Sequence, residues 1–180
     1  PVSEQEISNQ LLFETQSYAE SSICRRKLLL HYFGEDYKKD DCGSCDNCRK
    51  TYKMVDATEL LGLILETIHQ LNEKFRAEHI VDIIRGKESA GVLAYKHTEL
   101  ENFGCAEDEN EANLHAIIRQ AMVTGYIKKD IESYGDLKIT STGKKFMKRP
   151  TMFEVPIEVK NDEEDGDLSA GVAGCAAADD

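Results

Sequence analysis

The chain has 180 residues, enough for one domain or two small ones, and carries a formal net charge of −12 at pH 7. This acidic balance argues against nucleic acid as a partner of the whole chain, but the charge is distributed unevenly. No apolar run approaches the length of a membrane span and no signal peptide opens the sequence, so we expect a reducing, cytoplasmic setting and no membrane partner. Because Pro1 is not a natural start, we expect a fragment of a longer protein.

Two helices are predicted at the start of the sequence. Residues 6–20 carry apolar side chains spaced for one helical face, namely Ile7, Leu11 and Leu12. Ser21 or Ser22 can cap the second helix, and Gly34 suits its C-terminal end. The apolar residues of this second helix are expected to face a core: Leu28, Leu29, Tyr32 and Phe33.

Four cysteines stand at the spacing of a metal site. Cys42, Cys45 and Cys48 are separated by two residues each, and Cys24 lies in the first turn of the second predicted helix. Four thiolates form a closed tetrahedral set that suits structural zinc and leaves no position open for catalysis. A disulfide pair and an iron–sulfur cluster remain as alternatives, since spacing alone does not exclude a cluster. Two cysteines are left over without a predicted role: Cys105 and Cys175.

Helical patterns return after a polar connector over residues 49–55. Asp56 and Glu59 resemble a capping box that opens a helix. One face of that helix is apolar: Leu61, Ile64, Leu65, Ile68 and Leu71. Three further helical segments are predicted, the middle one short: residues 77–85, 92–101 and 111–124.

The periodicity changes from helical to alternating after Gly125. Tyr126, Ile127 and Ile131 indicate one strand, residues 133–136 a turn, and residues 137–139 the return strand. A last short helix follows, opened by Thr140 and Gly143 and ending at Phe146. Four apolar residues of the tail could dock as one extended strand: Phe153, Val155, Ile157 and Val159. The acidic run over residues 162–167 and the Ala/Gly-rich end indicate a disordered linker.

The residues around the cysteines resemble the zinc-binding subdomain of RecQ-type DNA helicases. The resemblance lies in Cys24-Arg25-Arg26, in Tyr32-Phe33-Gly34-Glu35, and in Cys42-Gly43-x-Cys45-Asp46-x-Cys48. It continues through about residue 148, in Ile83-Ile84-Arg85-Gly86, Ile118-Arg119-Gln120 and the strand after Gly125. It implies that the chain is the region that follows the two motor domains of such a helicase.

The implied fold is mainly α, with a zinc-bound helical platform, a winged helix with a short β-hairpin, and a disordered acidic tail. We expect a zinc-binding subdomain over residues 1–54, a winged-helix (RQC) domain over residues 55–149 and a flexible tail over residues 150–180. Because a two-helix platform buries little surface, the metal is expected to supply part of its folding energy. Arg25 and Arg26 are expected to pair with acids or pack on the neighbouring motor rather than contact phosphate.

A basic segment precedes the acidic tail. Residues 117–150 hold eight Lys or Arg residues against three acids, whereas residues 151–180 hold nine acids against one lysine. Ordinary winged helices place the third helix in the major groove, but here acids precede it, and carboxylates repel phosphate. DNA contact is therefore expected on the wing and the closing helix: Lys128, Lys129, Tyr134, Lys138, Lys144, Lys145, Lys148 and Arg149. Tyr134 stands at the predicted tip, where the resemblance implies contact with the duplex end; it could equally be a tyrosine that only decorates a turn.

No catalytic residue is predicted. The sequence lacks the G-x-x-x-x-G-K-[ST] phosphate loop, so ATP and Mg²⁺ belong to the missing motor domains and the chain itself should not hydrolyse ATP. The five histidines are scattered and are expected to be surface or packing residues: His31, His69, His79, His97 and His115.

The resemblance implies a DNA-binding accessory region of an ATP-dependent 3′–5′ helicase of DNA repair and recombination. We expect a monomer, associated with the bacterial nucleoid, that binds duplex, branched or junction DNA. Two other classes stay open: a free-standing zinc-containing winged-helix transcriptional regulator and a purely protein-binding module. A regulator would be expected to show a dimerisation helix and a basic recognition helix, and neither is evident.

Overall fold

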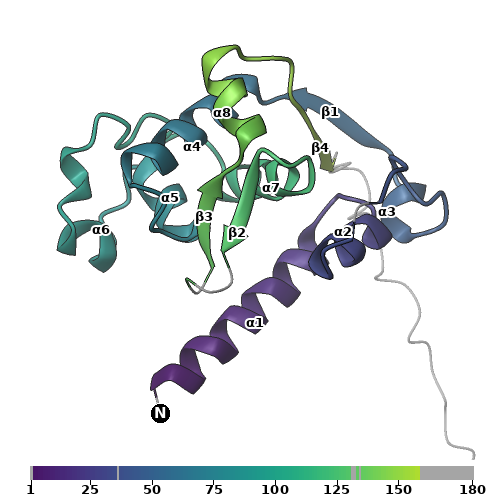
Figure 1. Ribbon diagram of the computed structural model, residues 1–180, viewed down its shortest axis with the longest axis horizontal. Helices are drawn as coiled ribbons and strands as arrows, with labels where there is room; N and C mark the ends of the chain where they lie inside the picture. The colour runs from purple at the N-terminus through teal and green to yellow at the C-terminus, as the bar shows by residue number, and fades with distance from the viewer. Residues whose placement is uncertain (1, 36, 131–132, 134, 159–180) are drawn as a thin grey trace, which may run out of the picture.

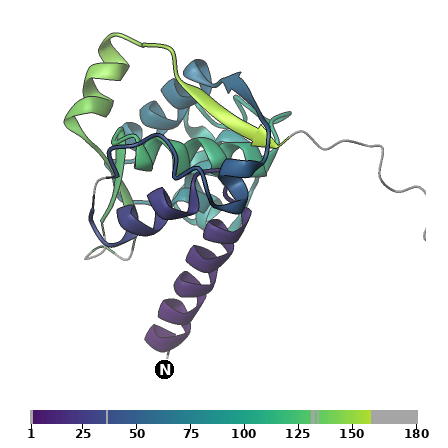
Figure 2. The ribbon, with the colours of Figure 1, turned by 90° about the vertical axis from the view of Figure 1, so that its right-hand side faces the viewer.

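The computed structural model describes residues 2–35, 37–130, 133 and 135–158. A long first helix, α1 (Val2–Glu20), leads into two short ones, α2 (Arg25–Tyr32) and α3 (Asp46–Arg49). The N-terminal part of α1 extends away from the rest of the molecule (Figures 1 and 2). No helix among the described residues is both long enough and apolar enough to cross a membrane.

A winged helix follows the first strand, β1 (Tyr52–Asp56). Its elements in chain order are α4 (Thr58–Gln70), α5 (Ala77–Ile84), α6 (Ala90–Ala94), η1 (His97–Glu99), α7 (Glu111–Val123), β2 (Ile127–Asp130), β3 (Asp136–Ile139) and α8 (Ser141–Lys148). The predicted mainly helical fold with a short hairpin is confirmed. The main helices of the winged helix begin and end within about two residues of the predicted positions, and the short segment over residues 92–101 divides into α6 and η1. The first helix, α1, begins four residues before the predicted start at residue 6, and α3 was not predicted.

One hydrophobic core holds the winged helix together. Apolar side chains from α4, α5, α7, the hairpin and α8 meet there, and the largest fully buried ones include Leu61, Ile64, Leu65, Ile80, Ile83, Ile84, Leu114 and Ile118. Burial of a Leu or Ile side chain contributes about 1.5–3 kcal/mol, so this cluster supplies most of the driving force for folding of the unit. By comparison, α2 contains no buried residue, which shows how little core the first part of the chain builds.

The wing is a two-stranded antiparallel hairpin. Its register runs from Ile127 opposite Ile139 to Asp130 opposite Asp136. Residues 131, 132 and 134 lie outside the described residues, so the predicted strand residue Ile131 and the predicted tip residue Tyr134 are not placed. The cap predicted for α8 is confirmed, because the Thr140 hydroxyl accepts a hydrogen bond from the Gly143 amide at 3.1 Å. A Cβ at Gly143 would lie 2.3 Å from the Tyr126 carbonyl oxygen, so only glycine lets α8 approach β2 this closely.

A second antiparallel pair joins the two ends of the winged helix. Strand β4 (Glu154–Glu158) pairs with β1, from Tyr52 opposite Glu158 to Asp56 opposite Glu154. Phe153 and Val155 enter the core, which confirms that this segment docks as an extended strand; Val159 lies outside the described residues. The prediction of a plain polar connector over residues 49–55 is wrong, since β4 supplies the strand partner from a hundred residues away.

The start of α4 differs in detail from the predicted capping box. Asp56 accepts hydrogen bonds from the amide of Thr58, at 2.9 Å, and from its hydroxyl, at 2.5 Å, and the helix begins at Thr58. The Thr58 hydroxyl also accepts from the Phe153 amide at 2.9 Å. The cap therefore fixes the helix start and the returning strand together.

The apolar face predicted for the second helix does not face a core. Tyr32 and Phe33 are 61% and 70% exposed, and Leu29 is also exposed. The inward orientation predicted for these side chains is wrong, because the platform offers no surface of its own to cover them. Three residues therefore form one exposed apolar patch on α2, here called the α2 patch: Leu29, Tyr32 and Phe33.

Candidate metal centre and nucleic-acid interface

Four cysteine sulfurs meet between α2 and α3. The Sγ atoms of Cys24, Cys42, Cys45 and Cys48 all lie within 4.8 Å of one another. Cys42 and Cys48 are 3.8 Å apart at sulfur, and Cys45 and Cys48 are 3.3 Å apart. In a tetrahedral site with Zn–S bonds of about 2.3 Å, neighbouring sulfurs stand about 3.8 Å apart. The donor set and its spacing therefore fit one ion of this size, and the cysteines of the described chain are all free thiols.

The backbone around the sulfurs is shaped for close approach. Gly43 takes the left-handed conformation, with φ of 66°, which lets the chain turn sharply between Cys42 and Cys45. Cys45 occupies the N-cap of α3, where its sulfur accepts a hydrogen bond from the Cys48 amide at 3.4 Å. Cys24 precedes the first residue of α2 and is buried. Two helix starts thus hold two of the four sulfurs.

Arg25 connects the cysteine loop to α1. Its guanidinium hydrogen-bonds both carboxylate oxygens of Asp46, at 2.9–3.3 Å, and donates to the carbonyl oxygens of Tyr18 and Ala19 at the end of α1. The guanidinium carbon also lies 5.1 Å from the centre of the Tyr18 ring. The hydrogen bond to Asp46 raises the pKa of Arg25 and lowers that of Asp46. The prediction that Arg25 pairs with an acid is confirmed.

Asn47 is a structural residue that the sequence analysis did not single out. It is 4% exposed, and its amide nitrogen donates to the carbonyl oxygens of Ser21 and Ile23, at 2.6 and 2.7 Å. Its amide oxygen accepts from the Tyr52 hydroxyl at 3.0 Å. Asn47 therefore ties the loop between α1 and α2, the short helix α3 and strand β1 together. Its place between two cysteines of the loop was the only available signal.

Hydrogen bonding and burial separate the thiol pKa values. A hydrogen bond from the Ser44 side chain, assisted by backbone amides, lowers the pKa of Cys42 to about 5. Burial raises the pKa of Cys48 to about 12. For Cys45, burial opposes ionisation, but backbone hydrogen bonds from Arg25 and Cys48 outweigh it and lower the pKa. A cation that gathers four thiolates must therefore displace a proton from Cys48, which makes binding weaker as the pH falls.

The eight residues predicted to contact DNA fall into four groups. Two carry partners within the chain: Lys129 forms an ion pair with Glu14 of α1, and Lys138 donates to the carbonyl oxygen of Glu73 at 2.6 Å. Lys144 lies 3.9 Å from the Glu73 carboxylate but stays exposed. Four others are exposed and make no side-chain hydrogen bond or ion pair with the described residues: Lys128, Lys145, Lys148 and Arg149. Tyr134 is outside the described residues.

The hairpin register separates the two wing lysines of β2. Lys128 stands opposite Lys138, and Lys129 stands opposite the buried Leu137. Residues directly opposite each other in an antiparallel pair share a face, so Lys128 and Lys138 lie on the outer face of the wing. Lys129 lies on the core face, directed towards α1. The structure therefore brings Lys128 and Lys138 together and separates Lys129 from them.

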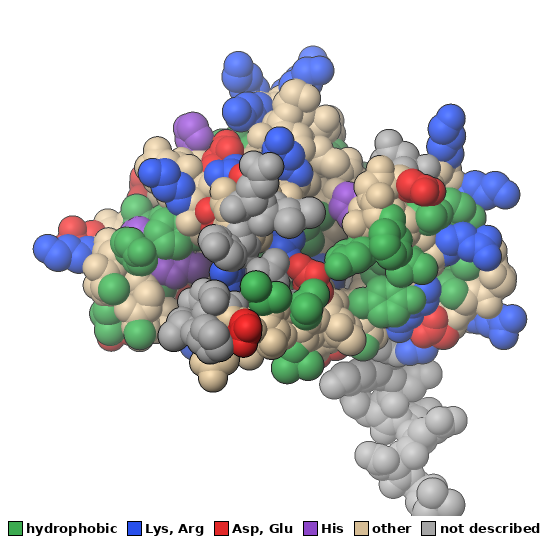
Figure 3. Space-filling view, turned by 60° about the horizontal axis from the view of Figure 1, so that its bottom comes forward, with side chains coloured by type: hydrophobic (Ala, Val, Ile, Leu, Met, Phe, Trp, Pro, Cys, Tyr) green, Lys and Arg blue, Asp and Glu red, His purple; other side chains and the backbone are tan. Residues whose placement is uncertain are grey.

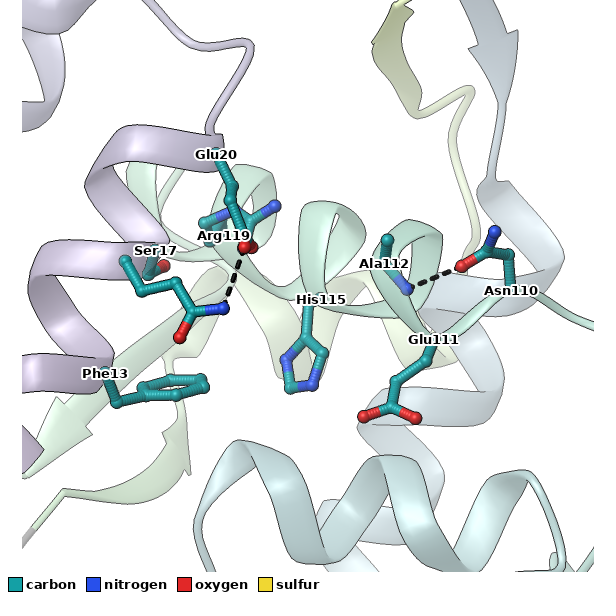
Figure 4. A pocket seen from close by; sticks show the side chains of 9 residues that line it. Phe13, Ser17, Glu20, Asn110, Glu111, Ala112, His115 and Arg119 are labelled. Atoms are coloured by element: carbon teal, nitrogen blue, oxygen red, sulfur yellow. Dashed lines mark hydrogen bonds between the residues drawn. The ribbon is translucent and has the colours of Figure 1, made fainter. Parts of the chain in front are cut away.

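The start of α7 is acidic and exposed, and α1 lies alongside the helix further on. A cavity of about 340 Å³ lies between the two helices, and Figure 4 shows Phe13 and Glu20 of α1 facing His115 and Arg119 of α7. The Phe13 and His115 rings meet edge to face at 5.8 Å, and Asn110 caps α7 through the Ala112 amide at 2.9 Å. Burial lowers the pKa of Arg119, and the negative charge of Glu20 partly offsets this effect. A helix start lined by carboxylates is a poor fit to a DNA major groove.

Comparisons with known proteins agree with this architecture. The sequence matches the RecQ zinc-binding family over residues 1–49 and the RQC domain family over residues 51–164. It is 28% identical to ATP-dependent DNA helicase RecQ of Haemophilus influenzae over 143 residues, which cover 79% of this chain and 22% of that protein. It is also 28% identical to ATP-dependent DNA helicase RecQ of Pasteurella multocida over 132 residues, which cover 73% of this chain and 21% of that protein.

The sequence is also similar to a eukaryotic protein. ATP-dependent DNA helicase Q1 of Rattus norvegicus is 30% identical over 133 residues, which cover 69% of this chain and 20% of that protein. The chain therefore spans about a fifth of the length of these curated relatives.

Proposed function

Because this chain belongs to the RecQ helicase family, in which it corresponds to the zinc-binding and RQC regions, we propose that it is the DNA-binding accessory region of an ATP-dependent 3′–5′ DNA helicase. The observation that carries the proposal is the pairing of a four-cysteine centre with a winged helix whose wing and closing helix are basic. The cellular role would be DNA repair and recombination at the bacterial nucleoid, in the cytoplasm, with the chain acting as a monomer.

The proposed ion is zinc, held by Cys24, Cys42, Cys45 and Cys48. Zinc accepts four thiolates in a tetrahedron and needs no open position when its role is structural. The buried area at this end of the chain is small, and the sulfurs come from both sides of a long loop, so the ion would fix the loop onto α2. ATP and Mg²⁺ would act in the motor domains, outside these residues.

The proposed DNA surface consists of the outer face of the wing and the exposed side of α8. Its basic members are Lys128, Lys138, Lys144, Lys145, Lys148 and Arg149. These side chains would contact backbone phosphates of a duplex or of a duplex/single-strand boundary without reading the base sequence. Lys129 and the start of α7 are not included, because Lys129 is paired with Glu14 and acids surround the helix start. Tyr134 is kept as a candidate contact to the duplex end.

The α2 patch is the proposed contact with the helicase motor in cis. Tyr32 and Phe33 meet edge to face at 5.3 Å and stand beside Leu29 on a helix with no buried residue. Exposed aromatic side chains in a cluster mark interaction surfaces rather than solvated ones. A contact with the motor would also explain why α2 carries an apolar patch that no part of this chain's described structure covers.

A fluorescence titration tests the proposal. The chain, purified with zinc, should bind a labelled 15-base-pair duplex carrying a 3′ single-stranded extension, and addition of salt should weaken the binding steeply. Sequence changes in the duplex should leave the affinity unaltered. A free-standing regulator would instead prefer one sequence strongly; this alternative is not favoured, since α7 presents no basic recognition face. Absence of binding at low salt to any DNA probe would refute the proposed function.

A further inference from the structure

Four ring side chains form a cluster beside the wing, here called the aromatic cluster: Phe75, His79, Tyr95 and His97. Phe75 stacks on His79, with ring centres 4.3 Å apart and planes at 15°. Tyr95 stacks on His97, with centres 5.5 Å apart and planes at 16°. The two stacks meet edge to face, since Phe75 and His97 are 5.0 Å apart at 81°.

A hydrogen bond between the two histidines locks this arrangement. His79 Nε2 and His97 Nδ1 are 2.8 Å apart, so one ring donates to the other and both ring planes are fixed. Burial lowers the pKa of both rings, with the charge of Asp82 opposing the change at His79. The sequence predicted only that each histidine is a surface or packing residue, because a contact across 18 positions leaves no local signal.

The outer ring of the cluster is open to solvent. Tyr95 is 63% exposed and its hydroxyl makes no hydrogen bond within the described chain. Lys74 and Lys96, each next in sequence to one of the four rings, are exposed as well. Figure 3 shows histidine and hydrophobic side chains gathered over the end of the molecule that α5 and α6 form, with Lys or Arg side chains nearby. Of the four rings, Tyr95 alone is exposed, whereas Phe75 is partly buried against the hydrophobic core.

The backbone that carries the cluster is strained. Among the described residues, three non-glycine residues have positive φ: Asn72 at 55°, Glu73 at 58° and Lys96 at 56°. All three lie in the two loops that present Phe75, Tyr95 and His97. Left-handed conformations are uncommon for residues other than glycine, and they gather at sites where a ligand or a switch needs the geometry. The two loops hold Phe75 against the edge of the core and leave Tyr95 at the surface.

The aromatic cluster is continuous with the wing. The Leu137 amide donates to the Phe75 carbonyl oxygen at 3.0 Å, and Lys138 donates to the Glu73 carbonyl oxygen at 2.6 Å. The Glu73 carboxylate lies 3.9 Å from Lys144, so its charge is directed to α8. The loop that holds Phe75 is therefore attached to strand β3 of the proposed DNA surface.

We propose that the aromatic cluster, through Tyr95 and His97, is a stacking platform for unpaired nucleobases of a single strand that leaves a duplex held by the wing. The proposal rests on the proposed function, because the wing must hold the duplex. Stacking on an exposed aromatic ring is tolerant of base identity, and lysines beside it neutralise the connecting phosphates. A single strand is favoured over an apolar peptide because the rings border a lysine-bearing surface rather than an apolar groove.

The test compares two DNA probes on the zinc-loaded chain. The first is a blunt 15-base-pair duplex, and the second is the same duplex with a ten-nucleotide single-stranded extension that carries 2-aminopurine, whose fluorescence falls when it stacks. Tyr95→Ala is compared with Tyr95→Phe, which keeps the ring, and with Leu12→Ala, which removes an exposed apolar side chain of α1. Thermal unfolding of each variant checks that the fold is retained, which the exposure of both positions favours.

We expect Tyr95→Ala to bind the extended probe about 5- to 100-fold more weakly, to leave blunt-duplex affinity unchanged and to abolish quenching of 2-aminopurine. Tyr95→Phe and Leu12→Ala should behave as the wild-type chain does. Wild-type affinity of Tyr95→Ala for the extended probe would overturn the platform and leave an apolar peptide as the occupant. Equal losses on both probes would overturn it as well. If the wild-type chain binds neither probe, the proposed function itself fails, whereas binding of the blunt duplex alone refutes only the platform.

Discussion

Lys129 of the wing forms an ion pair with Glu14 of α1, two residues that stand 115 positions apart in the sequence. The contact links the platform side of the molecule to the winged helix and withdraws one wing lysine from solvent. It also distinguishes two adjacent lysines of β2, because Lys129 is held by Glu14 whereas Lys128 forms no ion pair with any residue that the structure describes.

Lys129→Ala should therefore lower stability more than it lowers DNA affinity. Partly exposed ion pairs contribute about 0.2–1 kcal/mol, so we expect a loss of this size in the free energy of unfolding by urea. Glu14→Gln should give a loss of similar size, and the double variant should lose little more than either single one. A large drop in DNA binding for Lys129→Ala with unchanged stability would contradict the assignment.

Lys128→Ala should weaken DNA binding on every sequence alike. Each phosphate contact adds about 0.9 to the slope of log affinity against log salt, so the slope should become shallower by up to that amount. Glu107→Ala is the matched control, because it changes one exposed charge at the start of α7. It should leave affinity unchanged or raise it. The proposed DNA surface would be refuted if Glu107→Ala abolished DNA binding while Lys128→Ala left the affinity unchanged.

Cys45→Ser should release the metal. Loss of one of four thiolates opens the set and also removes the sulfur that accepts from the Cys48 amide, so helix content and solubility should fall. Elemental analysis should find about one zinc per chain in the wild type and much less in the variant. Cys105→Ser, at an exposed cysteine outside the cluster, should retain the full metal content. Iron and sulfide in the wild-type chain would show that the four cysteines hold an iron–sulfur cluster and not zinc.

Asn47→Ala should destabilise the first part of the chain. The change removes the amide group that bonds the buried carbonyl oxygens of Ser21 and Ile23, and such a loss costs about 1–3 kcal/mol. Hydrogen exchange should accelerate around α2 and α3 and stay unchanged in α4. Asn9→Ala, on the exposed part of α1, is the control and should have no effect. Uniform acceleration throughout the chain would show that the two parts unfold together.

Stability should fall as the pH drops below the ordinary histidine pKa of 6.5. Burial lowers the pKa of His115, so the unfolded chain binds a proton there before the folded chain does. The contribution of His115 is complete above that pH and is lost as the pH falls towards its lowered pKa. His115→Gln should reduce the pH slope of the unfolding free energy by at most about 1.4 kcal/mol per unit. Both chains are measured in excess zinc and the two pH slopes are compared. Protonation of the cysteines then contributes equally to both slopes.

Local patterns in the sequence predicted most of the winged helix. The cap at Thr140, the glycine at position 143 and the change of periodicity at Gly125 are short-range signals, and the structure contains the elements that they indicate. The same holds for the four cysteines, whose sulfurs do meet. These features depend on residues a few positions apart or on a strict spacing.

Features that depend on distant partners could not be predicted. Tyr52 is a strand residue only because Glu158 stands opposite it, and Lys129 is withdrawn from the wing surface only because Glu14 reaches it. Leu29, Tyr32 and Phe33 show the opposite case, since their helical spacing predicts a buried face but no surface of this chain covers it. Periodicity says that a face is apolar; it does not say which molecule buries it.

The pairing of β1 with β4 also constrains how the chain folds during synthesis. Strand β1 leaves the ribosome about a hundred residues before its partner, so for several seconds its edge has no neighbour. An exposed strand edge can pair with other chains, and a contact of such long range forms late. Truncation just after α8 would make that transient edge permanent and empty the core positions of Phe153 and Val155. The last few residues of β4 thus cover a strand edge that would otherwise be open to pairing with other chains.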